Sequence, residues 1–195
     1  GSITGPNRNY SSINDATICL QLQCLDGAVI EDISFKTAGI CLSAQYCPNA
    51  EISRNRYNDF YNGVEITSSL NYTGFGTTGE GIGQSTSTVI FRDRFYCTTA
   101  ALTNTAIRIH SANLVSINDC TIQGEEVKRG IHFDGANETA VHTFTVENLH
   151  LDFENGADYA AQVKDHTHTD YQPGMYGAGI DLDNFSGTLR VEGFS

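Results

Sequence analysis

The sequence predicts an all-β protein whose strands stack as a right-handed, single-stranded parallel β-helix of about six to seven coils. Two short strand patterns alternate along the chain without exception, and successive copies lie roughly one coil apart. A unit of this size cannot bury its apolar face alone, so its neighbours must stack into one continuous core. The composition agrees: the 195 residues include 19 Gly, no Trp and one Met, which favours short strands and turns over long helices.

Residues 1–16 show no periodicity and are predicted to be a lead-in segment or a tag remnant, because Gly1-Ser2 is typical of a cloned fusion. Strand periodicity begins at Ile18, where apolar residues occupy every second position. Residues 17–195 are therefore predicted to form one β-helix domain. We expect this domain to be a fragment of a longer chain.

The first strand pattern is an aliphatic residue, any residue and a second apolar residue, often preceded by Gly or Ala. Its six copies are Ile18/Leu20, Ile40/Leu42, Val64/Ile66, Ile107/Ile109, Ile131/Phe133 and Ile180/Leu182. The steps between copies are 22, 24, 43, 24 and 49 residues. The two long steps indicate a coil that carries an insertion or, for the last, two coils.

The second strand pattern is an aliphatic residue followed five positions later by another apolar residue. Its copies are Ile30/Phe35, Ile52/Tyr57, Ile90/Phe95, Ile117/Ile122, Val146/Leu151 and Leu189/Phe194. Polar residues inside the pattern suit a bend between two short strands of one coil. We assign Asp32, Asn55, Asp93 and Asp119 to this bend.

Two insertions, residues 68–88 and 152–179, are predicted to leave the stack as loops, where binding residues vary freely. The first places Tyr72 and Phe75 among five glycines and is either a sugar-contacting lip or an ordinary surface loop. The second carries Tyr171, together with His166 and His168. These histidines are either ligands of a metal ion or part of a polar loop, and we predict no metal site.

Outward side chains of the first pattern should line up in columns across successive strands, about 4.8 Å apart. One predicted column is Cys41, Glu65, Arg108, His132 and Asp181, and the next is Ser43, Thr67, His110, Asp134 and Asp183. As a catalytic site, Asp181, Asp183, Asp134, Glu65 and His132 would supply acid and base. Arg108, His110, Tyr72, Phe75 and Tyr171 would bind the substrate. The alternative is a solvated face whose charges pair across strands.

Charge and cysteine usage limit the functions and sites that we expect of this protein. Eleven Lys and Arg against 23 Asp and Glu give a net charge of -12, and we find no patch in which the basic residues gather, which disfavours nucleic acid. No apolar stretch is long enough to insert into a membrane. The six cysteines form no Cys-x-x-Cys pair. We expect Cys19 to stack on Cys41 and Cys24 on Cys47 as free thiols.

The coil repeat from Ile18 to Phe194 resembles the pectin-lyase-like right-handed β-helix superfamily, and within it the shaft of bacteriophage tailspikes and tail-fibre depolymerases. The similarity rests on coil periodicity, acidic composition, Asn/Thr/Gly-rich turns and unpaired cysteines. The polygalacturonase motifs Asn-Thr-Asp, Gly-His-Gly and Arg-x-Lys are absent, as is the clustered Asp column with Arg-x-x-Arg of calcium-dependent pectate lyases. No residue role is therefore transferred from those enzymes.

The resemblance implies a homotrimeric protein of the virion tail that acts outside the cell, needs no cofactor and binds bacterial surface polysaccharide: capsule, O-antigen or exopolysaccharide. It leaves open whether the chain is an enzyme that depolymerises this polysaccharide as an endoglycosidase or a lyase. One alternative is a non-catalytic structural or host-attachment rod. Another is a secreted bacterial polysaccharide lyase or epimerase.

Overall fold

The structure, a computed structural model, describes residues 1–4, 18–67, 87–98, 104–110, 112, 114–124, 127–134, 142–152, 163–165, 178–183, 185 and 187–195. Within these residues the regular elements are all β-strands. The all-β class is therefore confirmed for the described part of the chain.

Seventeen strands follow one another along the chain. They are β1 (Ser2–Thr4), β2 (Ile18–Gln23), β3 (Val29–Glu31), β4 (Ser34–Gln45), β5 (Ala50–Ser53), β6 (Arg56–Thr67), β7 (Ser87–Phe91), β8 (Arg94–Tyr96), β9 (Asn104–His110), β10 (Leu114–Asn118), β11 (Thr121–Gln123), β12 (Val127–Asp134), β13 (His142–Glu147), β14 (His150–Asp152), β15 (Val163–Asp165), β16 (Ala178–Asp183) and β17 (Gly187–Glu192).

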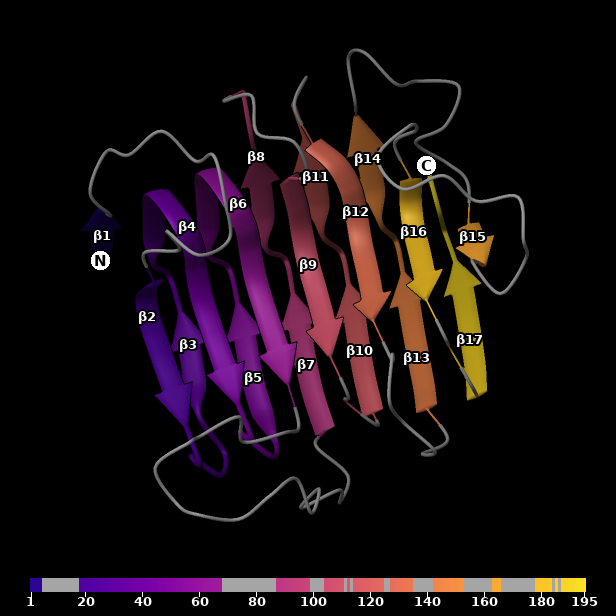
Figure 1. Ribbon diagram of the computed structural model, residues 1–195, viewed down its shortest axis with the longest axis horizontal. Coiled ribbons are helices and arrows are strands. Elements are labelled where there is room, and N and C mark those ends of the chain that lie inside the picture. Colours follow the sequence, from indigo (N-terminus) through magenta and orange to yellow (C-terminus); the bar gives the residue numbers. More distant parts are fainter. Residues whose placement is uncertain are drawn as a thin grey trace.

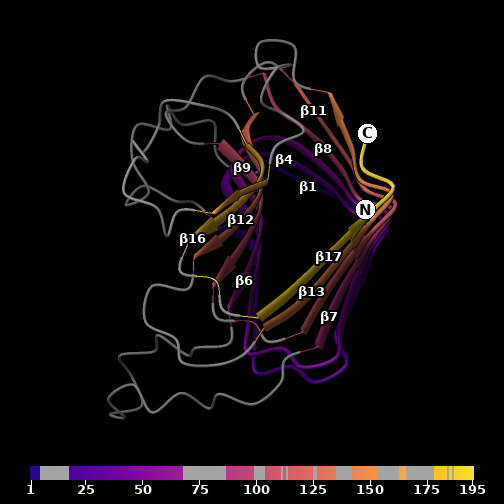
Figure 2. The same cartoon turned by 90° about the vertical axis from the view of Figure 1, so that its right-hand side faces the viewer.

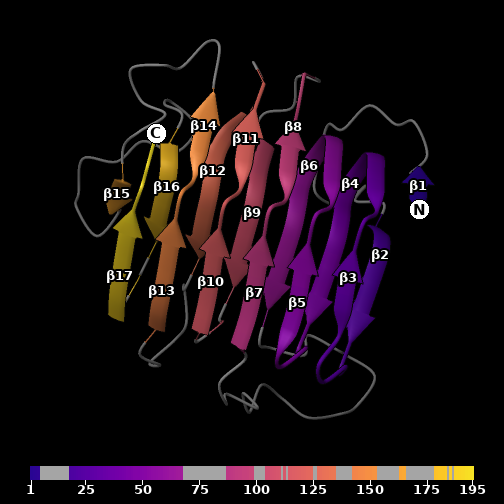
Figure 3. The same ribbon diagram turned by 180° about the vertical axis from the view of Figure 1, so that it is seen from behind.

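The strands form an eleven-stranded and a six-stranded sheet, in which each recorded strand pairing is parallel. The six-stranded sheet has the order β17-β13-β10-β7-β5-β3. The larger sheet bends along the long strands β4 and β6: β8, β11 and β14 continue its first half, and β9, β12 and β16 its second. Viewed end-on, the strands enclose a triangular cross-section with three flat faces (Figure 2). Figures 1 and 3 show the strands of each face side by side.

The first strand pattern is confirmed, with one error of register. The steps predicted Ile40 beside Val64, but the structure pairs Ile40 with Asn62 and Leu42 with Val64. The step between β4 and β6 is thus 22 residues, the same as between β2 and β4. Alternation of apolar residues cannot detect this error, because a shift of two residues leaves every side chain on the same face.

Small residues precede the first pattern for a steric reason. Cys41, Gly63 and Ala106 lie side by side, one position before the aligned aliphatic residues. A Cβ atom on Gly63 would lie 2.6 Å from the Ala106 carbonyl oxygen and 2.7 Å from the Phe95 ring. The backbone therefore approaches the core too closely here for a larger side chain. Cys41 is fully buried, and Ser43 rather than Cys41 pairs with Glu65, so the predicted place of Cys41 in the outward column is wrong.

The bend of the second pattern consists of two columns rather than one. Asp32, Arg54, Arg92, Asp119 and Asn148 all have φ between 52° and 57°, the left-handed region, which turns the chain between two faces of the stack. The backbone N–H group of each donates to a carbonyl oxygen of the neighbouring parallel strand. The Arg54 N–H, for example, donates to the Phe91 carbonyl at 3.0 Å. Asn55 and Asp93 lie one residue later and are fully buried. The four residues that we assigned to one bend position therefore belong to two columns: Asp32 and Asp119 to the outward one, and Asn55 and Asp93 to the inward one.

Apolar residues of the second pattern fill the centre of the core. Phe35, Tyr57 and Phe95 lie in register, and their rings stack with centroids 5.1 and 4.6 Å apart and nearly parallel planes. At the C-terminal end the predicted pair Leu189/Phe194 is wrong in one member. Val146 pairs with Val191, whereas Leu189 pairs with Phe144.

All six cysteines are free, which confirms the expected thiols. Cys19 lies beside Cys41, because Ile18 pairs with Ile40 and Leu20 with Leu42. The second predicted stack is wrong. Gln23 pairs with Gln45, so Cys24 is opposite Tyr46 rather than Cys47, and both residues at this turn have a positive φ.

The two predicted insertions lie mostly outside the described residues. The described part of the second includes β15, which pairs with β16 through Val163 and Ile180. This segment therefore adds a strand to the edge of the larger sheet, although the sequence predicts a loop there.

Candidate functional site

The outward column predicted from alternation exists on the face made by β4, β6, β9, β12 and β16. Its members are Ser43, Glu65, Arg108, His132 and Asp181, each paired with the next across adjacent parallel strands. We call this set the polar column. Four of its five members match the prediction, and Ser43 takes the place of Cys41 because of the register error described above.

A second column runs beside the first, two residues further along each strand. Gln45 pairs with Thr67, Thr67 with His110, and Asp134 with Asp183. Asp181 and Asp183 occupy alternate positions of β16, so both lie on the same face of the sheet. The expected neighbourhood of Arg108, His110, His132 and the β16 carboxylates is thus confirmed at the level of strand register.

The sequence reasoning missed the residue that contacts Asp181. Arg129 lies three residues before His132 on β12, and its Nε donates to Asp181 Oδ2 at 2.6 Å. Asn62 holds the equivalent position on β6, and its Nδ2 donates to Glu65 at 3.1 Å. The strand register pairs both Asn62 and Arg129 with Thr105. These three residues therefore form a further row of polar side chains beside the polar column. Strict alternation would place a residue three positions before His132 on the opposite face of the sheet, so the sequence does not predict this contact.

The side chains of the polar column and of the second column beside it differ in burial. Asp181 is 1% exposed and His132 is 8% exposed, whereas Glu65, Arg108, His110 and Asp183 are half-buried. Asp181 is ion-paired with Arg129, so one of its carboxylate oxygens is already engaged within the protein. The accessible groups are therefore two carboxylates, a guanidinium and an imidazole, which together can hydrogen-bond hydroxyl and carboxylate groups of a ligand.

The three aromatic residues predicted to bind substrate, Tyr72, Phe75 and Tyr171, lie outside the described residues, as do His166 and His168. The Asp134 side chain also lies outside the described part. Among the residues that the structure does describe, three or more His, Cys, Asp or Glu side chains do not come together as a metal site.

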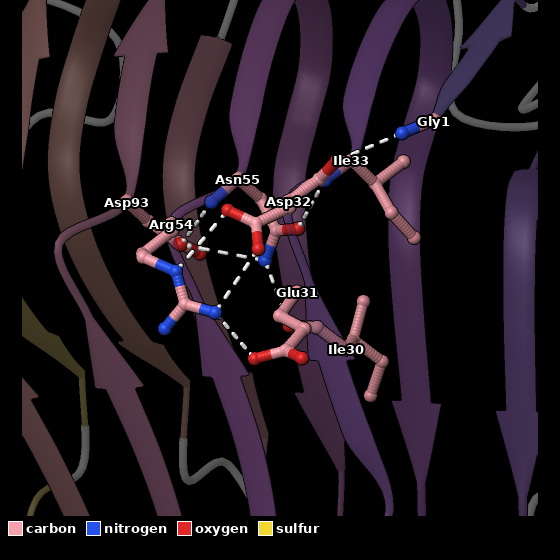
Figure 4. A network of polar contacts seen from close by, with 8 residues as sticks. All are labelled: Gly1, Ile30, Glu31, Asp32, Ile33, Arg54, Asn55 and Asp93. Atoms are coloured by element: carbon pink, nitrogen blue, oxygen red, sulfur yellow. Dashed lines mark hydrogen bonds and ion pairs between the residues drawn. The ribbon is translucent and has the colours of Figure 1, made fainter.

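A second polar cluster lies inside the core at the bend. Asp93 Oδ1 accepts hydrogen bonds from the Asn55 backbone N–H at 2.8 Å and from Asn55 Nδ2 at 3.4 Å. The Tyr57 hydroxyl donates to Asp93 Oδ2 at 3.0 Å. Burial raises the pKa of Asp93 to about 7, although the hydrogen bonds from Asn55 and Tyr57 act to lower it. Asn55 also donates to the Ile30 carbonyl and accepts from the Ile33 N–H, so the cluster joins the segments β3–β4, β5–β6 and β7–β8 (Figure 4).

Arginines gather on the outside of the same bend, a feature that was not evident from the sequence. Arg54 and Arg92 belong to the left-handed column, and Arg56 and Arg94 begin β6 and β8 and pair directly with each other. Arg54 is ion-paired with Asp32 at 3.0 Å and with Glu31 (Figure 4), and these contacts raise its pKa. Four of the eight arginines of the protein thus lie in one patch, which corrects the inference that basic residues do not cluster.

Comparison with known proteins gives no match among family models, curated proteins or solved structures. In the described part of the chain, a helix long and apolar enough to cross a membrane is also absent.

Proposed function

We propose that this protein is a right-handed parallel β-helix of the bacteriophage tailspike or tail-fibre kind, which binds a bacterial surface polysaccharide. The constant step of 22 residues from β2 to β4 to β6, the parallel pairing and the three-sided cross-section support the β-helix. The tailspike resemblance adds a homotrimer that acts outside the cell at the virion tail, and both remain proposals.

The polar column is the observation that carries the proposal. Glu65, Arg108, His132 and Asp181 repeat in register over four adjacent strands, which gives donors and acceptors at about 4.8 Å intervals along a flat face. A polysaccharide offers hydroxyl groups at repeated spacing, so it can contact the half-buried Glu65 and Arg108 of this column and the adjacent His110 at once. Rigid strands also position these side chains better than loops would.

Binding is better supported than cleavage. Acid and base catalysis by Asp181 and Asp183 would need one carboxyl group that holds a proton near the scissile bond. Asp181 is instead ion-paired with Arg129 and almost fully buried. If the protein cleaves its ligand, we assign Asp183 and Glu65 as the accessible carboxylates and His110 or His132 as the proton-transfer group.

The test is a panel of capsules, lipopolysaccharides and exopolysaccharides, screened for binding to the immobilised protein. Arg108→Gln combined with His110→Ala should reduce binding of the positive polysaccharide at least tenfold, because two donors are lost. Arg190→Gln, on the exposed face of β17, is the matched control and should bind as the wild type does. New reducing ends would indicate a hydrolase, and reducing ends with absorbance near 235 nm a lyase.

A non-catalytic rod is the second candidate, and the burial of Asp181 and His132 favours it. In that case the polar column would join neighbouring coils rather than bind a ligand. Failure of every polysaccharide in the panel to bind would support the rod and contradict the proposal. Binding that does not depend on Arg108 and His110 would contradict the assigned site.

A further inference from the structure

A pair of exposed arginines on the face next to the polar column has no obvious structural role. Arg56 of β6 and Arg94 of β8 are direct neighbours on paired strands, and both are exposed. Like charges in this arrangement repel one another and destabilise a sheet. Within the described residues, no ion pair or side-chain hydrogen bond is recorded for either guanidinium group.

The neighbouring arginines differ, because acidic side chains neutralise them. Arg54 is paired with Asp32 and Glu31, and Arg92 lies 3.7 Å from Asp119. The acidic residues of the bend therefore compensate the left-handed column and leave the next column, Arg56 and Arg94, as an uncompensated positive charge. This is unexpected in a chain whose net charge is -12.

An exposed aromatic ring lies next to this charge. Tyr96 follows Arg94 by two residues on β8, so both side chains project from the same outer face. The Tyr96 side chain is 48% exposed, one of the most exposed large apolar groups of the described chain. Asn58 pairs with Tyr96, and Gln123 of β11 pairs with it on the other side. A ring between two amides is a suitable surface for a sugar.

We propose that Arg56 and Arg94 bind the carboxylate of an acidic sugar whose ring packs on Tyr96. This inference rests on the proposed function, because it assigns acidic sugars to the polysaccharide that the protein recognises. The two arginines extend from neighbouring strands whose backbones lie about 4.8 Å apart, so both guanidinium groups can reach one carboxylate and hold it through charge-assisted hydrogen bonds. The binding of this anion would also remove the repulsion between the two arginines.

A nucleic acid is the less suitable partner for the same face. The uncompensated charge comes from Arg56, Arg94 and the exposed Lys36, which pairs with Asn58 on the same face. A phosphate backbone carries charge along its whole length and needs a longer basic track. Gln123 donates to Asp152 at the β14 end of this face, so the surface becomes acidic there. The face therefore fits one or two acidic groups with a ring between them.

The experiment compares two hexasaccharides by titration calorimetry: α-1,4-linked galacturonic acid, and the same chain with every carboxyl reduced to an alcohol. The wild type should bind the acidic hexamer more tightly, with an affinity that falls as salt is added. Arg56→Gln combined with Arg94→Gln should weaken binding roughly 100-fold, and Tyr96→Ala roughly tenfold, whereas Tyr96→Phe should bind normally. Arg190→Gln serves as the matched control.

The melting temperature distinguishes a role of the two arginines in binding from a purely structural role. Removal of two adjacent like charges should leave the melting temperature of the double arginine variant unchanged or slightly higher, although binding is lost. A lower melting temperature together with intact binding would overturn the inference, as would a single-stranded oligonucleotide that competes better than the acidic hexamer.

The outcome also separates this inference from the proposed function. If a polysaccharide of the panel binds through Arg108 and His110 and the double arginine variant binds it and the acidic hexamer normally, only the inference fails. If no polysaccharide of the panel binds to the wild type, the proposed function fails as well.

Discussion

Two polar arrangements run across neighbouring strands of this protein, one inside the core and one on an outer face. The inner one is Asn55 and Asp93 with the Tyr57 hydroxyl, and every contact is a hydrogen bond within the described chain. The outer one is the polar column, which contains both acidic and basic groups and includes half-buried members. Residues of similar polarity thus have different roles on the core side and on the outer side of the sheets.

The difference lies in how the polar atoms are satisfied. Inside the core, water cannot solvate a carboxylate, so Asp93 is retained only because Asn55 and Tyr57 supply donors. On the outer face, Glu65, Arg108 and His110 retain partial access and can exchange partners with a ligand. We therefore expect changes to the inner cluster to affect stability, and changes to the accessible part of the polar column to affect binding.

The largest effect should come from Asp93→Ala. The change removes three acceptor contacts and leaves the buried Asn55 N–H and Tyr57 hydroxyl without their partner, which should cost about 3 to 5 kcal/mol of unfolding free energy at pH 5. Denaturant titration measures this cost. Asp119→Asn is the control, because Asn tolerates the left-handed φ of 53° at this outward position, and it should cost under about 0.5 kcal/mol. Equal losses in both variants would contradict the distinction between the two columns.

The next effect is a dependence of stability on pH. Because burial raises the pKa of Asp93 from 3.8 to about 7 in the folded state, the folded protein holds this proton over a range in which the unfolded chain has lost it. The unfolding free energy should therefore fall as pH rises from about 4 to about 7, by on the order of 2 to 4 kcal/mol, and then level off.

Asp93→Asn tests the assignment of this pH dependence. The amide keeps the shape of the carboxyl but does not titrate, so the slope between pH 4 and 7 should become smaller in unfolding curves measured at each pH. A slope that is unchanged in the variant would assign the pH dependence to other groups.

The smallest of the three effects should come from Arg129→Met, on the outer face. The change removes the ion pair with the nearly buried Asp181, and we expect a loss of about 1 to 3 kcal/mol, because Arg129 retains partial exposure. Arg129→Met combined with Asp181→Leu should recover part of this loss, since the buried charge is then removed as well. A double variant no more stable than Arg129→Met would show that Asp181 has an independent role.

Most of the strand positions could be predicted from the sequence. Alternating apolar residues indicate which side chains face inward, so Leu42, Val64, Ile107 and Ile131 are core residues in both prediction and structure. Four of the five members of the polar column followed from the same alternation. The register between strands was less secure, because a pattern with a period of two fits equally well after a shift of two residues, as it did for Ile40 and for Leu189.

The sequence by itself determined the all-β class, the approximate number of residues between equivalent strands and the inward or outward direction of most side chains. These features follow from the repeated strand patterns and their local alternation. The tertiary structure decided which residues became neighbours. The close approach at Gly63, the left-handed bend that separates Asp93 from Asp119, and the ion pair of Arg129 with Asp181 each depend on strands far apart in the chain. The pairing of Arg56 with Arg94 has the same origin, since parallel strands bring together residues 38 positions apart.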